Sequence, residues 1–97
     1  MPIDIDAVRA DTPATADVIH FNNAGAALQP AAVVGAVVDH LRLEERLGGY
    51  EAGDVAAAAK AETYAAAAEL LGCRTDEIAL TTGASEAWWR AFQSLPL

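Results

Sequence analysis

The clearest pattern in the first half of the chain is an apolar stripe at helical spacing. Apolar side chains recur there at i, i+3, i+4 and i+7, which places them on one face of a helix. The four residues are Val34, Val37, Val38 and Leu41. Pro30 suits the first turn of a helix and Gly48 suits its end. The pattern therefore predicts a helix from about residue 30 to residue 47.

A second helical pattern occupies the alanine-rich segment that follows. Its apolar positions repeat at intervals of four and three, which again describes one face. They are Ala57, Ala61, Tyr64, Ala68 and Leu71. Asp54 can cap the start of this helix, and Gly72 lies where a C-terminal glycine belongs. Such a face of small residues would let a neighbouring element approach closely. The alternative is a surface helix that forms through the helix propensity of alanine alone.

Shorter elements are predicted on either side of these two helices. Ile3–Arg9 can form a short helix, which ends before Pro13 because a residue preceding proline is disfavoured in helical geometry. Val18–Phe21 and Ile78–Leu80 are short β-prone runs, so one or two short strands are expected. The helical spacing of three residues near the end of the chain predicts a last helix: Trp88, Phe92 and Leu95.

The turn between the second β-prone run and the last helix, "LTTGASEA", carries candidate chemistry. A strand that turns through Gly83 into a helix leaves unpaired backbone N–H groups, and these groups and the helix dipole attract an anion. Thr81, Thr82 and Ser85 add hydroxyl donors, which gives the turn the chemistry of a phosphate-binding cup. Glu86, in the first helical turn, could satisfy the same N–H groups or repel a phosphate. The alternative is an ordinary strand–turn–helix in which Thr82 or Ser85 caps the helix.

Composition narrows the class of protein. The 97 residues suit one small domain, and aromatic residues make up only 6% of them, so the chain can build only a modest core. The net charge of −8 argues against nucleic acid and anionic membranes as partners. No apolar run has the length of a membrane span or the pattern of a signal peptide, so a cytoplasmic protein is expected. His20, His40 and Cys73 have no metal-ligand spacing and are interpreted as structural or solvated, so no metal site is predicted.

Three blocks of sequence together suggest a family. They are "VRADTP", "IHFNNAGAALQP" and, after a helix, "DEIALTTGASEA". In this order they resemble the start of the class V aminotransferases, a group of pyridoxal 5'-phosphate (PLP) enzymes that includes cysteine desulfurases and isopenicillin-epimerase-like proteins. The resemblance runs from about Val8 to Phe92. The segment "HLRLEERLGGYEA", His40 to Ala52, is most similar to the ergothioneine-pathway C–S lyase branch.

The resemblance implies two binding sites. One is the family's turn that holds the PLP phosphate, and it matches Gly83, Ala84 and Ser85. The other is an N-terminal loop near the carboxylate of an amino-acid substrate, and it matches Asn23, Ala24 and Gly25, for which a plain turn is the alternative. Tyr50 could reach an active site across a homodimer interface, although a packed surface tyrosine is the simpler interpretation. Trp88 is interpreted as a core residue rather than a ring that stacks on the cofactor.

The family also implies an α/β fold of PLP fold type I. Residues 1–74 would form the N-terminal part of the small domain, and residues 75–97 would begin the large PLP-binding domain. This chain alone should be mostly α-helical with one or two short strands. The family's PLP-binding lysine lies beyond this segment, and the only lysine, Lys60, does not match it. No catalytic residue is therefore predicted.

The expected function follows from the resemblance. The chain would be the N-terminal portion of a PLP-dependent enzyme of C–S lyase, desulfurase or aminotransferase type, incomplete here and a homodimer when complete. The alternative is a non-catalytic truncated helical fragment or interaction module.

Overall fold

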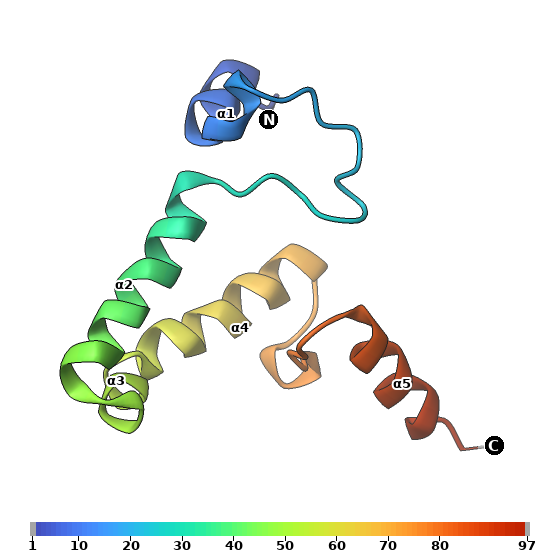
Figure 1. The fold of residues 1–97 in the computed structure, drawn as a ribbon. Coiled ribbons are helices and arrows are strands. Elements are labelled where there is room, and N and C mark those ends of the chain that lie inside the picture. Colours follow the sequence, from blue (N-terminus) through green and yellow to red (C-terminus); the bar gives the residue numbers. More distant parts are fainter. Residues whose placement is uncertain (1, 97) are drawn as a thin grey trace. The chain divides into compact units, whose positions relative to one another are not determined.

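The computed structural model describes residues 2–96, which are mostly helical (Figure 1). Backbone contacts divide them into two compact units, residues 2–54 and residues 55–96. The predicted boundary after residue 74 stays a prediction. In chain order the elements are α1 (Ile5–Asp11), the 3₁₀ helix η1 (Pro13–Ala16), α2 (Ala31–Leu47), α3 (Gly49–Val55), α4 (Ala57–Leu71), the 3₁₀ helix η2 (Thr75–Glu77) and α5 (Ala84–Ser94).

The first unit begins with the short helix α1, which confirms the predicted element with bounds shifted by two residues. The helix starts where it does because the Asp4 side chain accepts a hydrogen bond from the N–H of Ala7 at 3.0 Å. It ends at Thr12, whose hydroxyl donates to the carbonyl of Val8 at 2.9 Å. Thr12 is buried between α1 and the following η1, two elements that contact each other.

Helix α2 confirms the helix predicted from about residue 30 to residue 47. Pro30 is its N-cap, with φ −63° and ψ 150°. Gly48 ends it with a φ of 89°, a left-handed conformation that favours glycine. All four residues of the predicted stripe lie on α2 and are exposed, with 48% exposure at Val34 and 57% at Val37. The stripe thus forms a helix without burying its apolar face.

Helix α3 was not predicted. It follows α2 after one residue and contains Gly49 and Gly53, which lower helix propensity and indicate a break rather than a helix. Asp54 lies inside α3, so the expectation that it caps the next helix is wrong. Tyr50 is 91% exposed, so the interpretation of a packed surface tyrosine is also wrong.

The second unit is built on α4, the alanine-rich helix predicted from the sequence. Gly72 adopts the left-handed conformation at its end, with φ 68° and ψ 35°. The N–H of Gly72 donates to the carbonyl of Glu69 at 3.3 Å, and the N–H of Cys73 donates to that of Ala68 at 3.0 Å. This pair of bonds is the Schellman arrangement, which satisfies carbonyls that a helix end leaves free. The chain then forms η2, which contacts α4.

Within residues 2–96 there is no β-strand, so the prediction of one or two strands is wrong for this chain. The physical reason is that a strand exists only through pairing with another strand. Ile78 does have extended geometry, with φ −101° and ψ 130°, but the described residues supply no partner. The expectation of a mostly helical chain is confirmed, and the α/β class of the family stays a prediction.

Burial is confined to small side chains. Among the described residues, the buried apolar ones are Ala52 and Ala68, and no large side chain is fully buried. Trp88 is 73% exposed, so its interpretation as a core residue is wrong for this chain. No helix among residues 2–96 combines the length and apolar character needed to cross a membrane.

Candidate functional site

The predicted phosphate turn lies at the start of α5, in the second unit. Gly83 is the N-cap of this helix, with φ 175° and ψ 172°. This is extended backbone open to any residue, and a Cβ on Gly83 would meet no atom within 4 Å. The backbone conformation of the turn therefore does not itself require glycine at position 83. What glycine provides is open space beside the first N–H groups of the helix.

These N–H groups are free to bind a ligand. Within the part of the chain that the structure describes, the N–H groups of Ala84 and Ser85 have no hydrogen-bond acceptor, and neither does the Ser85 hydroxyl. The helix has no side-chain cap, so the alternative in which Thr82 or Ser85 caps α5 is wrong. The turn thus presents the backbone N–H groups of Ala84 and Ser85 together with the Ser85 hydroxyl.

The other two hydroxyls of the turn are already used. The Thr81 hydroxyl donates to the carbonyl of Gly83 at 3.0 Å, and the Thr82 hydroxyl donates to the carboxylate of Glu86 at 2.7 Å. Each hydroxyl has one proton to donate. Of the three hydroxyls predicted to serve an anion, only that of Ser85 remains available.

Glu86 joins the turn to the body of α5. Its Oε2 accepts from the hydroxyl and the backbone N–H of Thr82, the latter at 3.1 Å, and its Oε1 accepts from Nε of Arg90 at 2.7 Å. Hydrogen bonds hold the pKa of Glu86 below its usual range. The largest cause is the bond from the Thr82 hydroxyl, followed by the bond from the Thr82 N–H and then the bond from Arg90. The carboxylate is thereby engaged with Thr82 and Arg90 rather than with Ala84 or Ser85.

This network predicts a pH dependence of the first turn of α5. Because the pKa of Glu86 is lowered by folding, its contribution to stability is complete above the ordinary glutamate pKa of about 4.3 and is lost as the pH falls through the lowered value. In a carbon-13 NMR titration of the Glu86 carboxyl, the Thr82→Val variant should raise the midpoint, and more than Arg90→Gln does, because the Thr82 hydroxyl is the larger cause. An unchanged midpoint in Thr82→Val would contradict this account.

The predicted substrate loop lies in the first unit as a turn over Asn23, Ala24 and Gly25. The N–H of Gly25 donates to both the carbonyl and the side-chain oxygen of Asn22 at 3.2 Å. Nε2 of His20 lies 2.8 Å from the carbonyl of Ala26, across the turn. The structure therefore shows an ordered turn, and whether it binds substrate stays a prediction.

A hollow of about 760 Å³ lies beside this turn. Its lining includes His20 and Asn23 from the loop and Arg9 from α1. The remaining lining is chiefly apolar, with Val8, Val18, Ile19, Phe21, Leu28 and Pro30 among it. The hollow thus combines apolar walls with polar groups from two elements, which is the usual composition of a small-molecule site.

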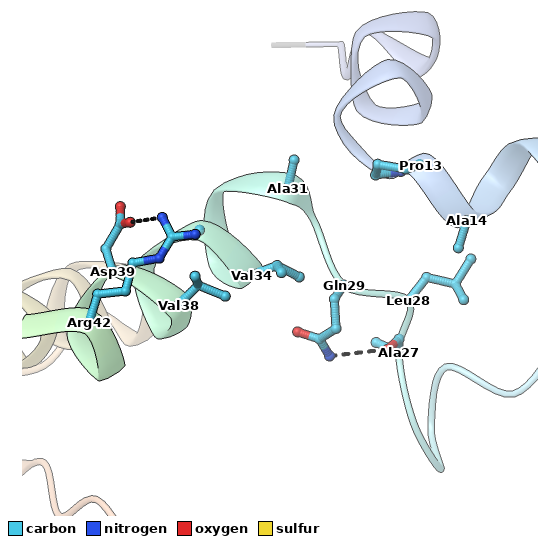
Figure 2. A pocket seen from close by; sticks show the side chains of 11 residues that line it. Pro13, Ala14, Ala27, Leu28, Gln29, Ala31, Val34, Val38, Asp39 and Arg42 are labelled. Atoms are coloured by element: carbon cyan, nitrogen blue, oxygen red, sulfur yellow. Dashed lines mark hydrogen bonds and ion pairs between the residues drawn. The ribbon is translucent and has the colours of Figure 1, made fainter. Parts of the chain in front are cut away.

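A second hollow of the first unit, of about 750 Å³, lies between the η1 segment, the loop before α2 and the start of α2 (Figure 2). Its charged groups are Asp39 and Arg42, which pair with each other at 3.9 Å. Gln29 donates its side-chain N–H to the carbonyl of Ala27 at 3.3 Å. Since its polar side chains are occupied by each other or by backbone, this hollow is an apolar surface rather than a chemical site.

The described residues contain no group of three or more His, Cys, Asp or Glu side chains arranged to hold a metal ion. His40 instead pairs with Glu44 one helical turn away, at 3.2 Å. Compared with known proteins, the chain matches no family model, no curated protein and no solved structure.

One residue and one contact of these sites were not predicted from the sequence. Arg90 could have been found, because Glu86 and Arg90 are four residues apart and such pairs lie side by side on a helix. The contact of His20 with Ala26 had no signal, because it depends on how an irregular loop folds back on itself.

Proposed function

We propose that this chain is the N-terminal portion of a PLP-dependent enzyme that acts on an amino-acid substrate, of C–S lyase, desulfurase or aminotransferase type. The observation that carries the proposal is the start of α5, where the N–H groups of Ala84 and Ser85 and the Ser85 hydroxyl are free and nothing occupies the space beside Gly83. These are the residues that match the family's phosphate turn.

The donor set fits a phosphate group in part. A helix N-terminus with free N–H groups favours an anion, and a hydroxyl adds a charge-assisted hydrogen bond. Glu86 opposes it with a negative charge in the same turn, which Arg90 offsets at 2.7 Å. When bound, PLP supplies the electron sink for reactions at the α-carbon of an amino acid. The residues of this chain would hold its phosphate, and Asn23, Ala24 and Gly25 would lie near the substrate carboxylate.

The exposed apolar surface supports the same proposal. Phe21, Leu70 and Trp88 are 94%, 85% and 73% exposed, far more than a folded domain leaves open for residues of this size. In the proposal, the rest of the enzyme and a second subunit cover these side chains. The cytoplasmic location expected from the sequence stays a prediction.

The exposed surface also favours a second candidate function, a non-catalytic helical module that binds another protein. Reading the coding DNA downstream of the Leu97 codon separates the two candidates. A continuing frame that encodes strands, an acidic residue for the pyridine nitrogen and a lysine segment supports the enzyme. A stop codon in its place supports the module.

The 97-residue chain by itself should have no PLP chemistry. Its only lysine, Lys60, is exposed on α4 and does not match the family's PLP-binding lysine, and an activated lysine nucleophile is typically desolvated or placed beside another cation. Mixing purified chain with PLP should give no stable stoichiometric band in the visible spectrum. A stoichiometric band that disappears in Lys60→Ala would refute this expectation.

A further inference from the structure

The loop between η1 and α2 has no regular secondary structure, yet two side chains tie its tip together. One tie is the contact between Nε2 of His20 and the carbonyl of Ala26 at 2.8 Å. The other is Asn22, which accepts the N–H of Gly25 on its side chain and the N–H of Ala26 on its carbonyl, at 3.2 and 3.0 Å. Both ties span the turn that contains Asn23.

The direction of the histidine bond is fixed by its partner. A carbonyl oxygen can only accept a hydrogen bond, so Nε2 of His20 must carry the hydrogen and donate it to Ala26. In the neutral ring this selects the tautomer protonated on Nε2. His20 thus acts as a specific donor and not only as a ring that fills space.

The asparagine tie explains the glycine of the turn. A Cβ on Gly25 would lie 2.7 Å from Nδ2 and 2.9 Å from Oδ1 of Asn22. Both distances are shorter than van der Waals contact, so any larger residue would displace the Asn22 side chain. Gly25 has no positive φ, and its role is therefore close approach rather than a special backbone conformation.

We propose that His20 is a positioning residue that holds the turn so that Asn23 stays at the wall of the adjoining hollow, where the carboxylate of the amino-acid substrate binds. The proposal rests on the proposed function for its ligand, while its structural basis is independent of it. His20 and Asn23 both line this hollow, and Arg9 contributes a positive charge to the same lining. Loss of the His20 donor frees the far end of the turn, and Asn23 moves with it.

The first test uses the 97-residue chain. Long-range nitrogen–proton NMR spectra should show the Nε2-protonated tautomer for His20. The His20→Phe variant should speed hydrogen exchange at the N–H groups of Gly25 and Ala26 roughly twofold to tenfold, the range expected for one lost hydrogen bond. His20→Gln should restore protection, because its side-chain nitrogen reaches the position of Nε2. His40→Phe makes the same change on α2 and should leave both N–H groups unaffected. Unchanged exchange in His20→Phe overturns the proposal.

The second test uses the PLP-loaded full-length protein and follows KM and kcat with its amino-acid substrate. His20→Phe should raise KM about twofold to tenfold with kcat and PLP retention unchanged, and His20→Gln should restore KM. If His20→Phe alters hydrogen exchange at Gly25 and Ala26 but leaves KM unchanged, the positioning role of His20 is overturned. The proposed binding of PLP is not affected by that result. Failure of the wild-type protein to bind PLP overturns the proposed function instead, and leaves the exchange result as the test of the tie itself.

Discussion

Replacing Ser85 by alanine should weaken PLP retention by about tenfold to a hundredfold in the full-length protein. The Ser85 hydroxyl has no acceptor among the described residues and would donate to a dianionic phosphate. A hydrogen bond to a charged group is worth about 1.5–3 kcal/mol, and each 1.4 kcal/mol is about a factor of ten. The measurement is the PLP dissociation rate and equilibrium constant for the purified variant.

Three variants serve as controls for this result. Ser85→Thr keeps the hydroxyl donor, so it should be nearly neutral. Ser94→Ala makes the same chemical change at the other end of α5, where the hydroxyl donates to the carbonyl of Ala91 at 2.7 Å, and should leave PLP retention unchanged. Gly83→Ala should leave the unfolding midpoint nearly unchanged, since its Cβ meets no atom, but should weaken PLP binding by filling the approach to the N–H groups.

The same variants separate a ligand role from an architectural one. Since Ser85 makes no capping hydrogen bond, Ser85→Ala should not lower the unfolding midpoint. Equal PLP affinity for serine and alanine at this position would remove the phosphate role. A loss of stability of about 0.5–2 kcal/mol with unchanged affinity would show that Ser85 caps the helix in the complete protein.

The isolated 97-residue chain should self-associate or be loosely packed. Its buried apolar residues among positions 2–96 are alanines, while Ile19, Phe21 and Leu70 are each more than 80% exposed, at 88%, 94% and 85%. Alanine buries too little apolar area to hold a chain of this length in one packed state. We expect a broad thermal transition, binding of a hydrophobic dye, and oligomers in sedimentation.

Two single substitutions on α5 test whether exposed apolar surface causes this self-association. Trp88 is 73% exposed, and Trp88→Gln should reduce dye binding and association. Arg90→Gln on the same helix removes no apolar surface and should not reduce either. A monomer with one sharp thermal transition and no dye binding would show instead that the chain packs as an independent domain.

The helices that the sequence determined are those whose signals are local. The valine stripe with Pro30 and Gly48 defined α2, and the alanine run with Gly72 defined α4, because periodicity, propensity and capping act within a few residues. Helix α3 was not predicted because Gly49 and Gly53 lower helix propensity. The cost is only about 1 kcal/mol for each glycine, which the tertiary context can override.

The sequence determined the candidate sites only in part. Sequence and family resemblance pointed to Gly83, Ala84 and Ser85, and the structure shows why Ser85 alone among the three nearby hydroxyls stays free: Thr81 and Thr82 donate within the turn. No spacing rule assigns one hydroxyl to a carbonyl and the next to a carboxylate, because that choice depends on the folded conformation of the turn.

Pairing and burial were decided by tertiary structure. Ile78 has extended backbone geometry, but a strand also needs a neighbouring strand, and residues 2–96 offer none. The apolar spacing of Trp88, Phe92 and Leu95 correctly predicted a helix, although Leu95 is the C-cap after its last residue. The spacing could not say whether the apolar face is covered, and in this chain it is exposed. Periodicity specifies which side chains share a face of a helix. Burial of that face also requires a second surface that packs against it, and only the tertiary structure decides whether such a surface is present.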